Sequence, residues 1–373
     1  MKDSLLNNTP LSLYIHLPWC ETQCPYCDFS ITTDPVNGND AKLAEAIIKD
    51  ISQSNHLIAG RKFKTVYFGG GTPSLASTES IKYILDSIKD KFSSTEIEIT
   101  LEMNPNNVSN DKVDELLFAG INRISLGVQS YNNQELQALG RSHNRESAIQ
   151  ATKALKGINS TIDLMYGIEK QTSESFTKSL EKVIQAEVNH LSLYQLTIEP
   201  NTIFYKKELL LPDEKEIEKI ERVAKDLLEK NGYKQYEVSS WAKPGFESQH
   251  NLNYWQFGDF LGVGPGSHSK ISNEQEIIRY RKIKPLEGYI KNQRSTDLRA
   301  ICDNELDMDL AMNLLRIKNG LEKKDLTISL PESFLEKYQK GVDEGLLLKN
   351  KIGATKRGYK FLNETIQLFF LNF

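Results

Sequence analysis

The sequence has little cysteine, no long apolar run and almost no net charge, and each shortage excludes a class of protein. Four cysteines in 373 residues are too few for a disulfide-stapled secreted scaffold. No stretch is apolar enough to span a bilayer, and the first ten residues, MKDSLLNNTP, lack the apolar region of a signal peptide. We therefore expect a cytoplasmic protein whose thiols stay reduced.

The charges show no excess of either sign. Lysine and arginine number 46 against 50 acidic residues, which gives a net charge of −4 without a strong basic or acidic block. Such a chain lacks the basic footprint of a nucleic-acid-binding protein, so we expect no nucleic-acid partner. The hydrophobic share of 39% and the charged share of 26% predict a packed globular fold.

Three of the four cysteines stand within eight residues. In the segment LYIHLPWCETQCPYCDFS, Cys20, Cys24 and Cys27 follow an apolar run directly. A structural zinc site would need a fourth ligand, for which only His16 is at hand, and that residue lies inside the run. A redox pair would leave one cysteine over. Three thiolates on a [4Fe–4S] cluster leave one iron open to a ligand, and we favour this interpretation.

The first 200 residues alternate between strand-like and helix-like segments, which predicts an α/β fold with a parallel sheet, either an open barrel or a doubly wound sheet. Residues 213–231 predict a charged helix, and residues 243–268, rich in glycine and aromatics, predict a long loop. From about 285 the pattern predicts a small helical, winged-helix-like domain. The six strand-like runs cover residues 11–17, 65–70, 97–104, 123–130, 161–167 and 190–198.

Polar residues interrupt these runs near their carboxyl ends, where a barrel places its active site. The segment GGGTP begins at Gly69, Glu102 closes the third run, Gln129 closes the fourth, and Asp163 lies in the fifth. A polar side chain in a buried strand is costly without a partner. GGGTP taken alone is equally typical of a tight turn, and one such polar residue is often structural. Together they favour a shared polar ligand.

The cysteine spacing C-x3-C-x2-C, with Tyr26 before the last cysteine, resembles the radical S-adenosylmethionine (SAM) superfamily. That resemblance implies a partial (β/α)6 barrel and a [4Fe–4S] cluster whose open iron binds SAM. A wider set of motifs resembles the family that holds the oxygen-independent coproporphyrinogen III oxidases and related heme chaperones, over nearly the whole chain. These motifs are YIHLPWCETQCPYCDF, YFGGGTPSL, LEMNP, ISLGVQS, LGRSH, IDLMYG and HNLNYW.

The family resemblance also implies two groups of cofactor-binding residues. The residues expected to contact the cluster-bound SAM are Tyr14, Gly70, Thr72 and Glu102. The residues that match positions holding a second SAM in the oxidases are Tyr26, Gly71, Gln129, Arg141 and Asp163. A guanidinium such as that of Arg141 suits a carboxylate, although without the resemblance it would be read as a solvated surface charge.

Two features separate the branches of this family. The oxidases resemble C-x3-C-x2-C-x-C, but here Phe29 stands at the place of the further cysteine. The oxidases also carry a longer stretch before the position of Tyr14, which is preceded by only thirteen residues in this chain. Both features favour the chaperone branch.

The segment HNLNYW, residues 250–255, resembles a signature associated with heme binding in the chaperones. It implies His250 as a ligand of heme iron, with Tyr254 and Trp255 as apolar surface for the porphyrin. The alternative is a structural histidine beside core aromatics. His268 is a second, weaker candidate, and a c-type attachment motif C-x-x-C-H is absent from the sequence.

We therefore expect a heme chaperone that binds a [4Fe–4S] cluster, SAM and heme, and delivers heme to an acceptor such as a respiratory enzyme. The alternative is an oxygen-independent coproporphyrinogen III oxidase, and a third reading is a structural cluster protein. No catalytic residue is assigned, and peripheral membrane association and a homodimer are both compatible with the sequence. Cys302 is expected to be a buried free thiol. The expected domains are a barrel at 1–240, a loop region at 241–284 and a C-terminal domain at 285–373.

Overall fold

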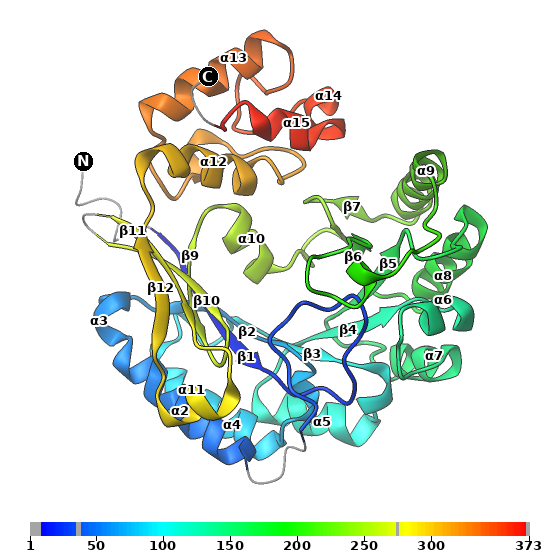
Figure 1. Ribbon diagram of the computed structural model, residues 1–373, viewed down its shortest axis with the longest axis vertical. Helices are drawn as coiled ribbons and strands as arrows, with labels where there is room; N and C mark the ends of the chain where they lie inside the picture. Colours follow the sequence, from blue (N-terminus) through cyan, green and yellow to red (C-terminus); the bar gives the residue numbers. More distant parts are fainter. Residues whose placement is uncertain (1–8, 35–38, 274–275, 371–373) are drawn as a thin grey trace.

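The computed structural model describes residues 9–34, 39–273 and 276–370, which form one curved sheet, helices around its outer face and a helical domain at one end (Figure 1). The strands in these residues join one 12-stranded sheet with the order β12-β11-β10-β9-β1-β2-β3-β4-β5-β6-β8-β7. The strands are β1 Leu11–Leu17, β2 Phe63–Gly70, β3 Glu98–Met103, β4 Arg123–Gln129, β5 Ser160–Tyr166, β6 His190–Gln195, β7 Lys234–Gln235, β8 Ser240–Ala242, β9 Asp259–Val263, β10 His268–Ser272, β11 Ile277–Lys282 and β12 Ser295–Ala300.

Helices follow most of the first six strands. The α-helices are α2 Asn39–Gln53, α3 Asn55–Ile58, α4 Thr78–Ile88, α5 Asn110–Ala119, α6 Asn133–Ala138, α7 Arg145–Ala154, α8 Ser173–Gln185, α9 Glu214–Lys230, α10 Gln249–Trp255, α11 Leu286–Lys291, α12 Asp303–Leu314, α13 Glu332–Asp343, α14 Lys356–Lys360 and α15 Leu362–Gln367. Short 3-10 turns are η1 Pro73–Leu75, η2 Lys89–Lys91, η3 Pro105–Asn107, η4 Phe204–Lys206 and η5 Lys323–Asp325.

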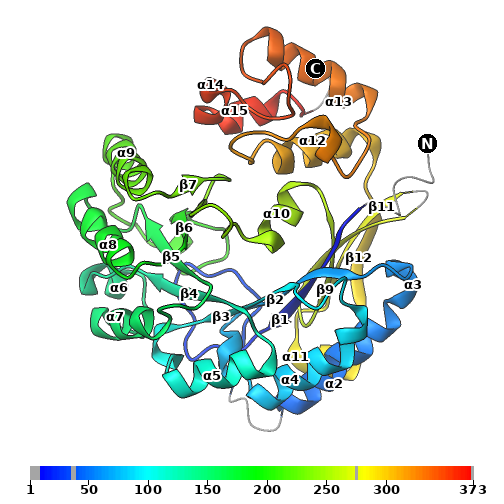
Figure 2. The same ribbon diagram turned by 180° about the vertical axis from the view of Figure 1, so that it is seen from behind.

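Strands β1 to β6 run parallel and in sequence order, so the six predicted strands and the open (β/α)6 barrel are confirmed. The helices that connect them lie along the convex side of the sheet (Figures 1 and 2). Local signals set several of their ends. Ser77 caps α4 by accepting a hydrogen bond from the backbone of Ser80, and Gly120 ends α5 in a left-handed conformation with φ 111°.

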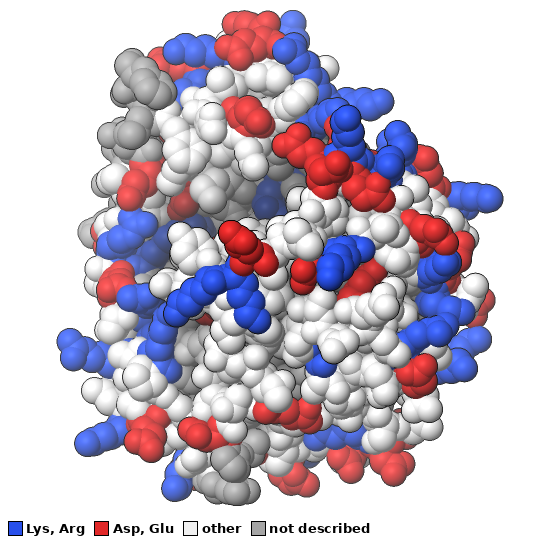
Figure 3. All heavy atoms as spheres, turned by 45° about the vertical axis from the view of Figure 1, so that its right-hand side comes forward, with Lys and Arg blue, Asp and Glu red and all other residues white. Residues whose placement is uncertain are grey.

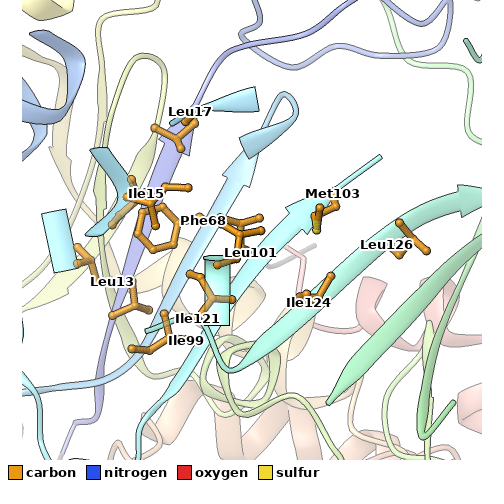
Figure 4. Packing of buried hydrophobic residues seen from close by; sticks show 14 of the residues in the cluster. Leu13, Ile15, Leu17, Phe68, Ile99, Leu101, Met103, Ile121, Ile124 and Leu126 are labelled. Atoms are coloured by element: carbon orange, nitrogen blue, oxygen red, sulfur yellow. The ribbon is translucent and has the colours of Figure 1, made fainter. Parts of the chain in front are cut away.

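The alternation of side chains along β1 decides what each face of the sheet carries. Leu13, Ile15 and Leu17 are 0–2% exposed and point toward the helices, where they join a core with residues of β2 to β4 (Figure 4). The intervening Tyr14 and His16 therefore face the barrel interior. The same alternation in β3 buries Leu101 under the helices and turns Glu102 inward. The apolar pattern that builds the core thus also aims the polar side chains at a shared space.

The prediction of a long loop over residues 243–268 is wrong. This segment contains α10, capped by the side chain of Ser248, and β9, which pairs in parallel with β1. Strands β10 to β12 then continue the sheet in antiparallel fashion as far as Ala300, beyond the expected boundary at 285. Glycine and proline made the segment look like a loop. Its strand β9 forms because the open edge of β1 offers unpaired backbone groups.

The helical domain has a core of its own, built mainly from α12, α13 and the segments that follow (Figure 1). Besides its helices, this domain contains two isolated antiparallel bridges, Leu321 to Ile352 and Leu347 to Ala354. Cys302 immediately precedes α12 and is exposed, so its predicted burial is wrong. Within the described part of the chain, no helix combines the length and the apolar character needed to cross a membrane.

Candidate functional site

The three clustered cysteines lie in the loop that follows β1, and none of them forms a disulfide. The backbone of Cys20 donates to the carbonyl of Thr32 at 2.9 Å, which closes the base of the loop. A tighter turn, from the amide of Cys27 to the carbonyl of Cys24 at 3.1 Å, brings the last two thiols together. Burial raises the pKa of Cys20 to about 11, so a metal that binds here must displace protons from thiols.

The donor set fits an iron–sulfur cluster better than a single ion. No three His, Cys, Asp or Glu side chains of the described ranges converge on one metal position. The thiolates of a cube bind different iron atoms, so they surround the cluster and do not meet at one point. His16, the fourth ligand that zinc would need, uses both ring nitrogens in hydrogen bonds to Tyr14 and to the carbonyl of Ser30. In the described part of the chain, the loop therefore offers three thiols, and the hydrogen bonds of His16 leave it unavailable as a fourth ligand.

A cavity of about 390 Å³ opens between the cysteine loop and the carboxyl ends of β2 to β6. Apolar contributors to its wall are Phe29, Ile31, Met103 and Met165. The structure thus brings together the cysteines and all but one of the residues predicted to bind SAM. The predicted residues on the wall are Cys20, Cys24, Cys27, Tyr26, Gly70, Gly71, Thr72, Glu102, Gln129, Arg141 and Asp163.

Glu102 is half-buried in this wall and is held from two sides. Tyr67 donates its hydroxyl to one carboxyl oxygen at 2.9 Å, and the amide of Gly70 donates to the other at 3.2 Å. Burial raises the pKa of Glu102 to about 7, and nearby Asp163 adds to the shift. The carboxyl group can therefore hold or release a proton near neutral pH.

Asp163 carries an unsatisfied acceptor. Its Oδ2 accepts a hydrogen bond from Ser125 at 2.7 Å, while its Oδ1 is buried and has no partner among the described residues. Burial raises the pKa of this carboxyl group as well. A buried polar atom without a partner is costly, and a donor group on a ligand would relieve that cost. The wall is therefore suited to the hydroxyl or ammonium groups of a nucleoside and an amino acid.

Gln129 is turned into the cavity by an irregular strand end. The pairing of β4 with β5 shifts register between Leu126 and Gln129, and Gln129 itself has φ 65°. A left-handed conformation is uncommon for glutamine, and such strain is concentrated at functional sites. Because of this register shift, the side chain of Gln129 faces the cavity at the point where the regular alternation of side chains along β4 ends.

Arg141 reaches the cavity from the loop after α6 and is fixed by several acceptors. It donates to the side chain of Asn104 at 2.6 Å and to the carbonyl of Gly127 at 3.0 Å. Its other nitrogen lies 3.5 Å from the sulfur of Cys24 and 3.4 Å from the hydroxyl of Tyr26. The guanidinium is therefore a positive charge held beside the cysteine loop and not a solvated surface charge.

Tyr14 is the predicted SAM contact that the wall of the cavity does not include. Its ring lies behind the wall, 6.2 Å from the ring of Tyr67, and its hydroxyl is 3.2 Å from the imidazole of His16. The backbone at Gly70, with φ 114°, passes so close that an added Cβ would stand 2.6 Å from that imidazole. Tyr14 and His16 thus shape the site from its second layer.

The residues predicted for heme do not present a free ligand. His250 is 1% exposed, and its two ring nitrogens meet Thr65 at 2.7 Å and Tyr254 at 2.9 Å. Its ring stacks on Tyr67, whose hydroxyl holds Glu102. Trp255 packs against the guanidinium of Arg316 at 4.3 Å, away from the cavity. In this structure the segment HNLNYW supports the barrel from within, and iron could reach His250 only after its hydrogen bonds break.

Sequence reasoning missed two residues that organise the wall. Asn104 donates to Thr72 at 2.8 Å and accepts from Arg141, so it connects three strand-end loops. Tyr67 orients Glu102. Asn104 stood in the motif LEMNP, at the end of the third strand, where it was as well placed as Glu102. Tyr67 had no such signal, because a tyrosine inside an apolar strand is indistinguishable from core.

Comparison with known proteins agrees with this geometry. Residues 14–183 match the radical SAM superfamily. A heme chaperone HemW from Buchnera aphidicola is 38% identical over 96% of this chain and 98% of its own length. The heme chaperone HemW of Escherichia coli is 35% identical, again over 96% of this chain and 98% of its own length.

The chain belongs to the heme chaperone HemW family of radical SAM proteins.

Among solved structures, the coproporphyrinogen III oxidase HemN of Escherichia coli matches with a TM-score of 0.79, over 98% of this chain and 92% of the oxidase. At 22% sequence identity, this match shows that the two proteins share a fold, and it shows nothing about activity. The HemW relatives match from end to end, so the helical domain belongs to the similarity as much as the barrel does. Membership in a radical SAM family implies a [4Fe–4S] cluster and SAM.

Proposed function

We propose that this chain is a cytoplasmic heme chaperone that binds a [4Fe–4S] cluster, SAM and heme, and passes heme to an acceptor protein such as a respiratory enzyme. The observation that carries the proposal is a three-thiol loop at the mouth of a polar cavity, with Phe29 in place of a further cysteine, in a chain that matches HemW proteins from end to end. The oxidase function has no comparable support, because the likeness to HemN extends only to the fold.

In the proposed site Cys20, Cys24 and Cys27 hold three corners of the cluster and leave the fourth iron open to SAM. When reduced, such a cluster supplies the electron that cleaves SAM in radical SAM proteins. The thiols are partly buried, and the cavity wall beside them includes the apolar side chains of Phe29 and Ile31.

The carboxylates and the guanidinium divide the recognition of SAM between them. Glu102 accepts hydrogen bonds from an amino group or from a ribose, and Tyr67 keeps its carboxyl group oriented. The free Oδ1 of Asp163 accepts from a second donor. The guanidinium of Arg141 is a positive charge held beside Cys24, so it is placed to bind the carboxylate group of SAM. Tyr26, Gly71 and Gln129 complete the part of the cavity that we assign to a second SAM.

The experiment that tests the function compares two activities in one preparation. The cluster is reconstituted without oxygen, and the loaded protein is assayed for hemin binding and for coproporphyrinogen III turnover. We expect stoichiometric hemin binding without formation of protoporphyrinogen. Oxidative decarboxylation of the propionates would instead establish the oxidase, and a chain that binds neither porphyrin would be a structural cluster protein.

A transfer assay separates a chaperone from a simple heme-binding protein. Hemin-loaded protein is mixed with a heme-free respiratory enzyme, and the recovered heme absorption of that enzyme is followed over time. We expect transfer to be faster than from free hemin held by albumin at the same concentration. Equal rates from both donors would contradict a delivery function.

A further inference from the structure

Among the six histidines of the chain, His268 leaves its imidazole free. His16, His190 and His250 engage both ring nitrogens in hydrogen bonds. His143 is buried and bonds through Nε2 to the carbonyl of Val128. His268 is exposed, and its ring makes no hydrogen bond to any residue in the described ranges.

One other exposed histidine, His56, differs from His268 in its surroundings. It lies on the short outer helix α3, where one ring nitrogen is bonded to the carbonyl of Gln53 at 2.9 Å. His268 instead begins β10, on the concave face of the sheet extension. A ligand bound there would face the barrel mouth, whereas one at His56 would lie on the outer helical layer.

The pairing of the strands shows what surrounds His268. It pairs with Arg281 of β11, and Lys270, two residues further along the same face, pairs with Phe260 and Arg279. Two residues along a strand span about 7 Å, so Phe260 and Arg279 occupy the row next to that of His268. Gly262 lies beside His268, where an added Cβ would stand 2.0 Å from its carbonyl oxygen. Gly262 therefore allows the backbones of β9 and β10 to approach closely, and Arg281 is the side chain paired with the imidazole across the strands.

The next row supplies two aromatic rings. The ring of Tyr254 meets that of Phe260 edge to face at 4.7 Å, and both side chains are partly exposed. Tyr254 belongs to α10, which packs across the concave face of the sheet (Figure 1). An apolar macrocycle can lie against these two rings with an edge directed along the sheet toward His268.

Cations gather around the imidazole from the neighbouring elements. Arg281 pairs with Asp297, at side-chain exposures of 42% and 59%, so this ion pair can open at little cost. Lys284 has no ion-pair partner among the residues described, and Arg279 is held by Asp309 of the helical domain. These groups suit the two propionates of heme. Figure 3 shows a hollow between the helical domain and the barrel, with basic side chains within it and at its rim.

The same charges keep the imidazole in the form that binds iron. Burial and then Arg281, Lys284 and Arg279 lower the pKa of His268, while Asp297 raises it. The neutral ring, with a free nitrogen lone pair, is the form that coordinates a metal.

The site also adjoins the cysteine loop. Ser30 donates to the carbonyl of Lys284 at 3.3 Å, and an added Cβ on Gly266 would stand 2.7 Å from the Cβ of Ser30. Phe29, which is 59% exposed, precedes that contact directly. A porphyrin on the concave face would therefore lie next to the cluster loop and close to its exposed phenylalanine.

We propose that His268 is the axial ligand of heme iron, that Tyr254 and Phe260 support the porphyrin, and that Arg281 and Lys284 bind its propionates. The inference rests on the heme binding proposed above and names the site that performs it. It assigns His250 a supporting role, because Thr65 and Tyr254 already occupy its nitrogens.

The test is a hemin titration of the cluster-loaded protein, followed by difference absorption and by the low-temperature electron paramagnetic resonance of the heme. We expect His268→Ala to weaken hemin binding at least tenfold and to remove the histidine-ligated signal. Free imidazole added to this variant should restore the signal. His56→Ala, the matched exposed histidine, should behave as the parent protein does.

Two further comparisons separate iron ligation from general porphyrin affinity. Metal-free protoporphyrin IX should bind the parent and His268→Ala equally, because it offers no iron. The double variant Arg281→Gln/Lys284→Gln should weaken hemin binding but leave the binding of hemin dimethyl ester unchanged, since the ester has no propionate charge.

The outcomes distinguish this inference from the proposed function. If the parent binds no hemin, both fail. If His268→Ala keeps the affinity and signal of the parent, heme binding stands and the ligand assignment is wrong. Loss of the signal in His250→Ala, with an unchanged circular dichroism spectrum and a normal signal in His268→Ala, would return the ligand to His250.

Discussion

Single side chains at the strand ends decide what the cavity can hold. Three thiols stand at its mouth, one carboxyl group is satisfied by Tyr67 and Gly70, and another keeps an open acceptor. These groups cost stability when they are buried without a ligand. The cavity is therefore built to be filled, and substitutions in it have different consequences for cofactor content and for folding.

Removal of one clustered thiol should abolish the cluster. With Cys20→Ala only two sulfur ligands remain, and we expect loss of the bound iron and of the visible absorption after anaerobic reconstitution. Iron analysis and absorption spectroscopy measure this directly. Cys302→Ala is the matched control, because Cys302 is exposed and precedes α12 in the helical domain. Normal iron content in Cys20→Ala would refute the ligand assignment.

The raised pKa of Glu102 should make the stability of the SAM-free protein depend on pH. Between its ordinary value of 4.5 and about 7, the folded state holds a proton that the unfolded state releases. The free energy of unfolding should therefore fall as pH rises through this window. In Glu102→Gln we expect this fall to be smaller, by up to about 3 kcal/mol.

Denaturant unfolding of the SAM-free protein at pH 5 and pH 8 measures the difference. Glu181→Gln, at an exposed position of α8, is the control and should leave the pH dependence unchanged. An identical pH dependence in Glu102→Gln and the parent would mean that Glu102 titrates normally in the folded state.

At the scale of the element, the β-strands position most of the side chains of the site. Alternation along β1 and β3 could be read from the sequence, and with it the inward direction of Tyr14 and Glu102. The strand–helix repeat predicted a parallel sheet, and the observed order β1 to β6 is that of the open barrel implied by the family resemblance. Strand β9 could not be predicted in the same way. Asp259–Val263 contains Gly262 and precedes the glycine-rich turn at 264–266, and it forms a strand because β1 has an unpaired edge.

Because Gly70 lies so close to His16, adding one methyl group at residue 70 should strongly reduce stability and SAM binding. Gly70→Ala places a Cβ 2.6 Å from the imidazole and keeps a backbone φ of 114°. We expect a loss of more than about 2 kcal/mol in the free energy of unfolding, together with weakened SAM binding. Denaturant unfolding and SAM titration measure the two effects.

Gly157→Ala separates conformational strain from the clash. Gly157 has φ 84°, but no atom lies within 4 Å of an added Cβ. Its substitution should cost about 1 kcal/mol and leave SAM binding unchanged. If Gly70→Ala and Gly157→Ala had equal effects, the imidazole of His16 would have to move away from the added methyl group at no cost.

At the scale of the whole molecule, the helical domain is fastened to the barrel by a buried charge contact. Arg316 of the helical domain lies over the ring of Trp255 at 4.3 Å and 3.4 Å from the carboxyl group of Glu237. The side chain of Glu237 is 2% exposed. Loss of the guanidinium would leave this carboxylate buried and unpaired.

Arg316→Ala should therefore loosen the helical domain. We expect a loss of about 3 kcal/mol in stability and faster proteolytic cleavage between the sheet and α12. Limited proteolysis and thermal unfolding measure both effects. Lys360→Ala is the control, because its ion pair with Glu218 spans the same two parts at exposures of 67% and 66% and contributes little. Equal cleavage rates in the two variants would contradict the role of Arg316.

The sequence by itself predicted a cluster site at three cysteines and a parallel strand–helix repeat, because these are local patterns, and its motifs indicated the family and with it the barrel. The tertiary structure decided which histidine is free. His250 lies in an aromatic segment and His268 follows a glycine-rich one. The residues adjacent to them in the sequence do not show which imidazole is free to bind a ligand. Thr65 comes from β2 to occupy one ring nitrogen of His250, and Tyr254 of the same helix occupies the other, whereas the ring of His268 is exposed and has no hydrogen-bond partner among the described residues. Hydrogen-bond partners that are distant in sequence exist only once the sheet has closed around them.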